Sequence, residues 1–586
     1  MLIANVIAMR STQVGDYIYR VSQPSLAMGR VPGIKVVTVG VLSPHLGDVL
    51  RTADVAILHL LSEADVLPLM EARRQRGQVT VYEISDHFMA AHQGVGIRGW
   101  FSDPVNRANA LALIHGADAV QVTGRGLADA FGEHNRQTVV FENQIESMGQ
   151  PPREPGGTVR IGWAGSDGHT QDLIQIRGVI ADACRRFPNA TFSFMGNDQQ
   201  FEQVFGAIPS AQKTYTRPGS LADYRRFLDT LDIGIAPMLS NPYNHCRSDV
   251  KFLEYAASGV VPVLQRITPY EQHAIHGKNA FLFRDATELG AILTEVISNA
   301  ALRGAVSREA HAYVSTDRRE DHHAAERVRF YASLATGAPA DNLGDVPLHR
   351  LDPGSQTYDV ETHPAETALV LGIEAEATGA PSAARARAFF DQAAALRPDY
   401  ALAYFWRGRS HELRHEPEAA NGFARAIEAN PSSLRAFLHL ARVQAPREPD
   451  VALATLDRGL AVSPRHAPFL EAQAQVHEDR GDLERARRLY QAARDASAFL
   501  GSATAGLGRV CSRLGRTAEA LEAFRAAVAS SPDDAVAHRM LAEQLFASGD
   551  VARASAHCVR ALELDRHDAT ANALLPKLIS ALEKVP

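Results

Sequence analysis

The stretch NPYNHCRSDVKFLEYAASGVVPV, residues 241–263, decides the fold because it reads in succession as a turn, a helix and a buried strand. Asn241-Pro242 is typical of a turn, and Ser248 can cap the helix that follows. Gly259 can end that helix, and the apolar run after it is typical of a strand inside a sheet. The segment therefore predicts a helix that leads directly into a sheet.

The predicted helix presents a hydroxyl, a cation and a carboxylate on one side. Ser248, Lys251 and Glu254 share that side, whereas the apolar residues between them lie on another. Helix-terminal amides and Lys251 suit the phosphates of a nucleoside diphosphate, and Glu254 suits the hydroxyls of its ribose. A solvated helix face with an ordinary Lys–Glu pair explains the same spacing equally well.

Working outward, short β-rich runs alternate with helical patterns over the first 335 residues. This alternation is typical of parallel sheets covered by helices on both faces. A stretch rich in Pro and Gly, residues 149–157, divides the runs into two sets. The sequence thus predicts an α/β fold of two Rossmann-like domains, residues 1–150 and 151–335, which face each other across a cleft. The predicted strands are Leu2–Ile7, Lys35–Gly40, Val55–Leu60, Val79–Ile84 and Ala119–Val122 in the first domain, and Val159–Trp163, Thr191–Phe194, Ile233–Ala236, Val261–Leu264 and Ala280–Phe283 in the second.

Beyond these domains the pattern becomes helical and periodic. Residues 336–365, rich in Pro, Gly and Asp, predict a linker before an all-α region, residues 366–586. There Gly481, Gly515 and Gly549 recur every 34 residues, and two series of alanines keep the same period. This pattern resembles the tetratricopeptide repeat, and it predicts roughly six repeats followed by a capping helix over Ala569–Leu582.

Composition excludes several classes of protein. The 586 residues carry a formal net charge of −7, so the chain lacks the overall basic field on which a generic nucleic-acid-binding protein relies. Cys184, Cys246, Cys511 and Cys558 lie far apart, which argues against a disulfide scaffold or a structural zinc site. No run approaches the roughly 20 apolar residues of a membrane span. We expect a cytoplasmic protein.

A second candidate segment opens the second predicted domain. The strand ending at Ala164 leads into Gly165-Ser166-Asp167-Gly168-His169, and a helix is predicted to begin near Asp172. A small-residue loop between a strand and a helix lets backbone N–H groups approach phosphate oxygens. His169 stands where a donor contact would be useful, although a solvated loop histidine is the alternative.

The first domain contributes Ser85-Asp86-His87, directly after the strand Val79–Ile84. Side chains at the carboxyl end of a parallel strand project into the cleft. Asp86 and His87 could position an acceptor hydroxyl or remove its proton. A turn-forming aspartate that caps a helix is the other reading of this triplet.

The segment at 241–263 resembles the donor-site helix of GT-B glycosyltransferases, particularly the family-4-like group. The likeness rests on Glu254-Tyr-Ala-Ala-Ser258-Gly259 followed by Val260-Val261-Pro262-Val263, with one residue more before the proline than is usual. It covers residues 1–335 and implies that a final helical stretch, about residues 316–333, crosses back to the first half. The family usually has a first glutamate eight positions before the second; here that position is Cys246. Asn244, Arg247 and Ser248 are the nearby polar substitutes.

The resemblance implies transfer of a sugar from a nucleotide-sugar donor with retention of configuration. Lys251, Arg247 and the Gly165-Ser166 loop would stabilise the departing diphosphate, and Glu254 would hold the ribose. If the reaction inverts instead, Asp86 or His87 is the candidate base. The first half lacks a D-x-D pair, so we expect a reaction without a metal ion or other cofactor.

The repeats offer a concave surface suited to peptide segments, so an acceptor protein recruited by them is the leading hypothesis. A polysaccharide or lipid-linked acceptor, with the repeats binding an assembly partner, stays open. A third possibility is an adaptor protein whose glycosyltransferase half has lost activity, and it is Cys246 that motivates this alternative.

Overall fold

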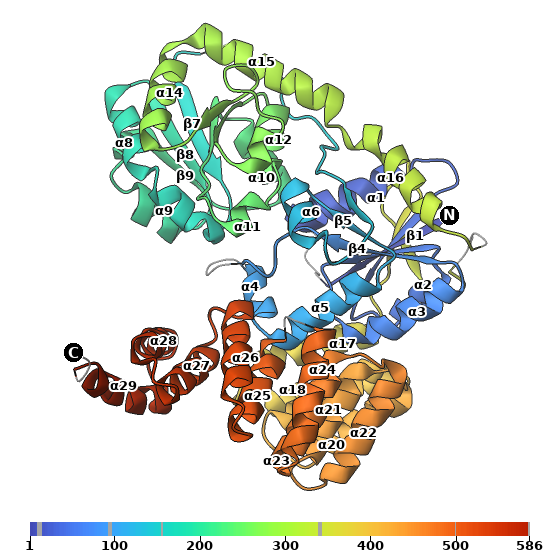
Figure 1. Cartoon of the computed structure of the whole chain (residues 1–586). Coiled ribbons are helices and arrows are strands. Elements are labelled where there is room, and N and C mark those ends of the chain that lie inside the picture. The colour runs from blue at the N-terminus through green and yellow to red at the C-terminus, as the bar shows by residue number, and fades with distance from the viewer. Residues whose placement is uncertain (9–14, 92–95, 154–155, 338–342, 498–499, 584–586) are drawn as a thin grey trace.

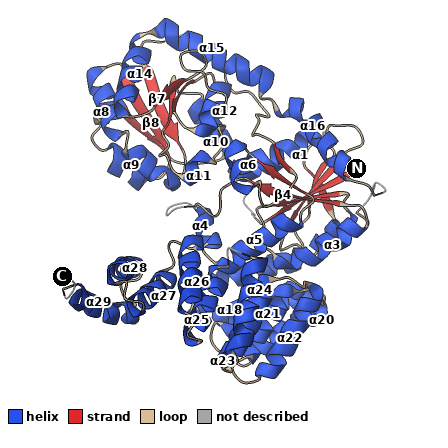
Figure 2. Cartoon of the chain, in the orientation of Figure 1, coloured by secondary structure: helices blue, strands red, loops and turns tan. Residues whose placement is uncertain are grey.

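Two parallel sheets and a helical array make up the chain in the computed structural model (Figure 1). The structure describes all residues except 9–14, 92–95, 154–155, 338–342, 498–499 and 584–586. Among the described residues, strands occur in the two α/β domains and not in the helical array (Figure 2). The predicted fold class is confirmed: an α/β region with two parallel sheets precedes an all-helical region.

The sheet of the first domain has eight strands in the order β13-β14-β2-β1-β3-β4-β5-β6. All neighbouring pairs are parallel except β13 and β14. The strands are β1 (Leu2–Ile7), β2 (Lys35–Gly40), β3 (Val55–His59), β4 (Val79–Ile84), β5 (Ala119–Val122), β6 (Thr138–Val140), β13 (Leu348–Arg350) and β14 (Thr357–Val360). The order reverses between β1 and β3, so this sheet has its topological switch point there.

The sheet of the second domain has six parallel strands in the order β12-β11-β10-β7-β8-β9. They are β7 (Val159–Ala164), β8 (Ala190–Met195), β9 (Lys213–Thr216), β10 (Ile233–Ala236), β11 (Val261–Gln265) and β12 (Phe281–Phe283). Numbered within the domain, the order is that of a doubly wound nucleotide-binding sheet, whose crevice opens between its first and fourth strands. Here these strands are β7 and β10.

Helices cover both faces of each sheet (Figure 1). Those of the first domain are α1 (Gln23–Met28), α2 (Leu46–Thr52), α3 (Leu67–Gln75), α4 (Gly96–Phe101), α5 (Pro104–Gly116) and α6 (Arg125–Phe131), with the single-turn segments η1 (Tyr17–Ser22) and η2 (Ala64–Val66). Those of the second are α7 (Thr170–Ile174), α8 (Arg177–Arg186), α9 (Asp198–Phe205), α10 (Leu221–Leu228), α11 (Pro242–His245), α12 (Val250–Ala257), α13 (Thr268–Glu271), α14 (Ala286–Ser298) and α15 (Ala300–Asp317), with the turns η3 (Asp167–His169) and η4 (Ser210–Gln212).

Part of the predicted linker belongs to the first sheet, so the prediction of an unstructured connection is wrong there. β14 pairs with β2 through residues 357–359, and β13 folds back on β14. The hydroxyl of Thr357 donates to the Ser25 carbonyl (2.9 Å), and that of Ser355 donates to the Leu26 carbonyl (3.0 Å). Because these strands are short and lie between Pro, Gly and Asp residues, their local sequence does not distinguish them from a loop.

The predicted return of the chain to the first half is confirmed. Helix α16 (Glu320–Leu334) buries Ala324, Val328 and Tyr331 in the core of the first domain. At its start Arg318 makes two hydrogen bonds to Asp249 (2.7 and 3.2 Å), next to the start of α12. Both side chains are buried, so this ion pair ties the crossover to the candidate donor helix.

The described residues of the helical region form six helix pairs and a final helix α29 (Ala569–Leu582), as predicted. The pairs are α17 (Pro364–Ala377) with α18 (Ala383–Leu396), α19 (Ala401–Glu412) with α20 (Ala419–Ala429), α21 (Leu434–Gln444) with α22 (Pro449–Val462), α23 (Ala467–Asp479) with α24 (Leu483–Ala496), α25 (Gly501–Arg513) with α26 (Thr517–Ser530), and α27 (Ala535–Ala547) with α28 (Val551–Leu564). The periodic glycines turn the chain between paired helices with φ of +80° at Gly481, +74° at Gly515 and +87° at Gly549. Only glycine adopts such angles without strain, which explains the period.

The helical array packs against the first domain (Figure 1). Arg435 at the start of α21 pairs with Asp65 (2.8 Å). Farther along, the His466 ring lies 3.0 Å from the Asn109 amide oxygen of α5. Ala108 of α5 belongs to the hydrophobic core of the array. The array is therefore held in a defined place relative to the cleft.

The four cysteines are free and buried, as expected for a chain without a disulfide scaffold. Within the described ranges, no single helix is long and apolar enough to cross a membrane, and one pair, α14 with α15, meets the criteria of length and composition only when joined across a bend of 103°.

Candidate active site

A cavity of about 980 Å³ lies between the carboxyl ends of the two sheets. Its walls include residues after β1, β3 and β4 of the first sheet and after β7 and β10 of the second, so both switch points border it. The helical array closes a third side. The polar and aromatic lining residues used below are Asp16, Tyr19, Arg20, Glu63, Glu83, Asp86 and Trp100 of the first domain, Gly165, Ser166, Tyr224, Tyr243, Arg247, Lys251 and Glu254 of the second, and Trp406 and Arg435 of the array.

Lys251 and Glu254 meet on the wall of the second domain, as the helical spacing predicted. The ammonium of Lys251 lies 3.1 Å from one carboxylate oxygen of Glu254 and donates to the Tyr224 hydroxyl (2.7 Å). Tyr224 donates to the same Glu254 oxygen, while Tyr19 of the first domain donates to the other (2.9 Å). Glu254 therefore accepts a hydrogen bond from Tyr19 across the cleft, and its negative charge lies beside the positive charge of Lys251.

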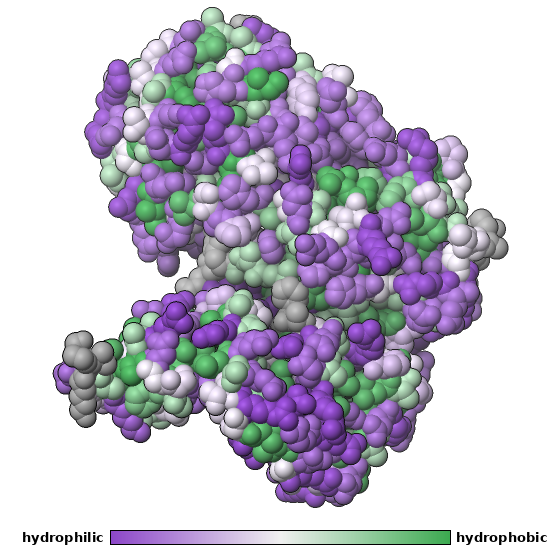
Figure 3. All heavy atoms as spheres, in the orientation of Figure 1, coloured by the Kyte–Doolittle hydropathy of each residue, from purple (hydrophilic) through white to green (hydrophobic). Residues whose placement is uncertain are grey.

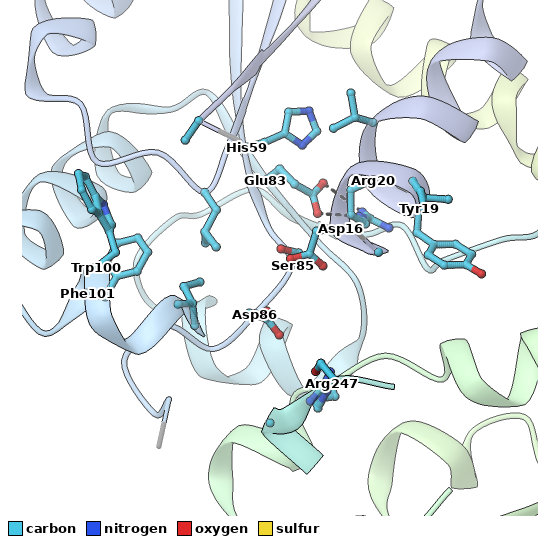
Figure 4. Close-up of a pocket in the computed structure, with 18 of the residues that line it drawn as sticks. Asp16, Tyr19, Arg20, His59, Glu83, Ser85, Asp86, Trp100, Phe101 and Arg247 are labelled. Atoms are coloured by element: carbon cyan, nitrogen blue, oxygen red, sulfur yellow. Dashed lines mark hydrogen bonds and ion pairs between the residues drawn. The ribbon is translucent and has the colours of Figure 1, made fainter. Parts of the chain in front are cut away.

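Arg247 reaches the middle of the cavity from the turn before α12, opposite Asp86 (Figure 4). Its guanidinium lies 5.6 Å from the centre of the Tyr243 ring, and the Tyr243 hydroxyl donates to Asp86 (3.0 Å). Burial alone would lower the pKa of Arg247, but Tyr243 and Asp86 raise it above its ordinary value. The cavity therefore contains a permanent cation.

Two carboxyl groups of the first domain face that cation. Burial raises the pKa of Asp86, and the charge of Arg247 opposes the shift only in part. Burial and the neighbouring Asp86 raise the pKa of Asp16 to about 7. Burial thus favours the protonated form of both groups, and Asp16 can hold or release a proton near neutral pH.

The loop after β7 brings Gly165, Ser166 and Gly168 to the cavity, as predicted. A Cβ atom on Gly165 would lie 2.6 Å from the Trp163 ring, so only glycine fits there. His169 does not line the cavity: its Nδ1 lies 2.9 Å from an Asp172 carboxylate oxygen, and burial lowers its pKa. His169 therefore supports the loop beside the cavity instead of lining the cavity itself.

Ser248 and His87 also lie outside the cavity lining. Helix α12 begins after Asp249, and Ser248 does not cap it; instead its hydroxyl accepts a hydrogen bond from the Asn143 amide (2.9 Å). The His87 ring packs edge-on against Phe131 at 5.2 Å, and burial lowers its pKa. Of the predicted site residues, the structure brings together Lys251, Arg247, Glu254, Asp86, Gly165 and Ser166.

Cys246 packs into the hydrophobic core of the first domain, and burial raises its pKa to about 11. At Gly126 of α6, an added Cβ would lie 3.1 Å from the Cys246 Cα and 2.5 Å from the His245 carbonyl. The position at which the resembled family has its first glutamate is therefore packed against the first domain and does not line the cavity.

Sequence reasoning missed the buried pair of Arg20 and Glu83, which are joined by hydrogen bonds of 2.8 and 3.0 Å (Figure 4). Arg20 also donates to the Phe141 carbonyl (2.7 Å) and the Asn143 amide oxygen (2.9 Å). Arg20 thereby ties this part of the cavity lining to residues 141–143, in the segment that connects the two domains. A carboxylate inside the otherwise apolar run of β4 was the available signal.

Among the described residues, one group of side chains could converge on a metal ion: His411, Glu416 and Glu418 in the helical array. Glu416 is already paired with Arg387 (2.7 Å) and with His411 (2.6 Å). This group lies outside the cavity lining.

Comparison with known families identifies the helical region. Residues 445–500 and 513–578 match two models of the tetratricopeptide repeat. This region is a tetratricopeptide repeat array. The two matches cover less than half of the chain, and a search of curated proteins finds no relative.

Three solved structures are similar to parts of the chain at low identity. HepE from Anabaena in complex with UDP aligns over 57% of this chain and 100% of its own, with 13% identity and a TM-score of 0.43. TarM aligns over 48% of this chain and 57% of its own, with 9% identity and a TM-score of 0.37. The Cut9–Hcn1 hetero-tetramer of the APC/C aligns over 37% of this chain, which spans 43% of that one, with 19% identity and a TM-score of 0.32. At these values the similarities do not indicate an activity. The α/β architecture is defined by the strand orders of the two sheets.

Proposed function

We propose that the chain is a glycosyltransferase that transfers a sugar from a nucleotide-sugar donor to an acceptor protein. The observation that carries this proposal is the placement of Lys251, Arg247 and Glu254 in one cavity at the switch points of two parallel sheets. Ligands of doubly wound sheets bind at such points. The resemblance of residues 241–263 to a donor-site helix supports the same assignment.

In this proposal the second domain binds the donor. Lys251 and Arg247 meet the diphosphate, and the backbone of the Gly165-Ser166 loop adds N–H groups. Glu254 accepts hydrogen bonds from ribose hydroxyls, which replace the Tyr19 hydroxyl that it binds in the structure. No residue of this arrangement requires a metal ion, because the two cations offset the charge of the leaving group.

The transfer breaks the bond between the anomeric carbon and the diphosphate oxygen, whose electron pair stays on the diphosphate. A new bond forms between that carbon and the acceptor oxygen, and the acceptor loses its proton. We propose retention of configuration, in which a diphosphate oxygen takes the proton. In an inverting reaction Asp86 takes it, and the anomeric configuration of the product distinguishes the two.

The acceptor is proposed to be a protein because repeat helices form one side of the same cavity. Ile373, Trp406 and Arg435 belong to three successive repeats. A segment bound along these helices would enter the cavity without leaving the repeat surface.

An adaptor role without catalysis is the second candidate, and the packing of Cys246 away from the donor space favours it. The test is a panel of nucleotide sugars with release of the nucleoside diphosphate as the readout. We expect release from one donor class, lost in Lys251→Ala and Glu254→Gln but kept in the exposed controls Lys278→Ala and Glu271→Gln. Binding and release of none of the donors would leave the adaptor reading.

A further inference from the structure

The end of the cavity nearest the repeats is aromatic. Trp100 and Phe101 of α4 lie together at one end in Figure 4, with Tyr19 at the other and Asp86 between them. Trp406 and Ile373 of the repeats line the same cavity. Trp100 is 56% exposed and lines the cavity, so its ring is available to a ligand there.

Trp406 has a buried indole N–H with no acceptor among the residues that the structure describes. Trp100 differs, because its indole N–H donates to the Ser62 hydroxyl (2.8 Å). Because this N–H is buried beyond the reach of a ligand, Trp406 offers the cavity an apolar ring surface.

The charges at this end restrict the occupant. The guanidinium of Arg435 is already paired with Asp65 (2.8 Å). Glu63, which follows the Trp100 partner Ser62 in the chain, adds a carboxyl to the lining, and Asp86 lies farther along, opposite Arg247. The phosphate of a lipid acceptor would be repelled by Glu63, whereas an uncharged segment would not.

We propose that this end is an acceptor subsite for a polypeptide, in which an apolar or aromatic side chain flanking the modified residue packs between Trp100, Phe101 and Trp406. The inference rests on the proposed glycosyl transfer to a protein and adds the place and the side-chain preference of the acceptor subsite. The hydroxyl-bearing residue of the acceptor lies beside Asp86. Helices α17, α19 and α21 carry the repeat residues that line the cavity, so a segment bound along them reaches this place. The surface is hollowed between the second domain and the array (Figure 3).

The test uses the full chain, the donor found active in the panel, and a positional-scanning library of peptides with a central serine or threonine. The readout is the ratio of transfer to peptides with an aromatic flanking residue over those with glycine at the same place. Within one variant this ratio is independent of the amount of folded protein and of donor binding. We expect a preference for aromatic or large apolar residues in the natural sequence.

Trp100→Ala should reduce this ratio by about fivefold, the size of an aromatic contact. Trp406→Ala, which removes the other tryptophan ring of this end, should reduce the ratio by about the same factor. Leu371→Ala, an exposed position of α17 outside the cavity lining, is the matched control and should keep the natural ratio.

A ratio near one in the natural sequence, or a ratio unchanged by Trp100→Ala, would overturn the proposal. Transfer to a polyprenyl phosphate in lipid vesicles but to none of the peptides would also overturn it, while glycosyl transfer itself would stand. Failure to release nucleoside diphosphate from any donor would instead refute the proposed function.

Discussion

The two walls of the cavity differ in how their charges are held. On the wall of the second domain, Lys251 and Glu254 are paired at 3.1 Å, and tyrosine hydroxyls complete the carboxylate's hydrogen bonds. On the wall of the first domain, Asp16 and Asp86 face each other's charge, and the pKa of each is raised. Fixed charges suit the binding of a diphosphate, whereas carboxyl groups with raised pKa values suit proton transfer. The difference assigns donor binding to one wall and acceptor chemistry to the other.

Removal of the Arg247 guanidinium should have the largest effect on turnover. Arg247→Ala takes away the positive charge in the middle of the cavity, so we expect turnover to fall on the order of 100- to 1000-fold, as for the loss of a group that stabilises developing charge. The measurement is the steady-state rate of transfer. Arg136→Ala, at an exposed arginine, serves as the control. A fall of less than about threefold would remove Arg247 from the mechanism.

Asp86→Asn tests the acceptor wall. If Asp86 accepts the proton, the variant should transfer on the order of 100-fold more slowly. If Asp86 accepts the proton, the rate of the natural sequence should also increase with pH above the ordinary carboxyl pKa of 3.8, because burial raises the pKa of Asp86, and the variant should lose this dependence. A pH–rate profile that is identical in both chains would assign the proton to another acceptor, as expected for a retaining reaction.

Asp16→Asn separates stability from chemistry. The pKa of Asp16 is about 7 in the folded chain against an ordinary value of 3.8, so the folded state binds the proton more tightly. Its stabilising contribution is complete below pH 4 and is lost as the pH rises toward 7. Asparagine cannot ionise, so the variant should have a Tm higher by roughly 4 °C at pH 8 and nearly equal at pH 4. Thermal scans at both pH values, with the exposed Asp129→Asn as control, measure this; an equal shift at both would contradict it.

The smallest effect is expected at the contact between the walls. Tyr19→Phe frees one oxygen of Glu254 from the hydrogen bond across the cleft, so ribose no longer competes with a phenol. Nucleotide affinity should rise by about fivefold, the value of one hydrogen bond. Titration calorimetry compares it with Tyr358→Phe at the edge of the first sheet. Weaker binding in Tyr19→Phe would show that the tyrosine contacts the nucleotide itself.

The same two walls explain how much could be predicted from the sequence. The donor wall is built mainly from two contiguous segments, and helical spacing was enough to bring Lys251 and Glu254 together. The rest of the cavity is assembled from residues such as Asp16, Trp100 and Trp406, which lie in three distant segments of the chain and come together only in the fold. Period and composition gave the domain order and the repeats, because each repeat contacts its neighbours along the chain. The strand β14 was missed because its pairing with β2 is a tertiary contact.

Nucleotide affinity, measured in matched variants, tests most directly whether one wall binds the donor and the other serves the acceptor. Calorimetric titration of a nucleoside diphosphate into the natural sequence, Lys251→Ala and Trp100→Ala compares the donor wall with the acceptor end. We predict at least a tenfold loss in Lys251→Ala, the scale of a charge-assisted contact, and a change within about twofold in Trp100→Ala. An equal loss in both variants, or no binding of any nucleotide to the natural sequence, would contradict it.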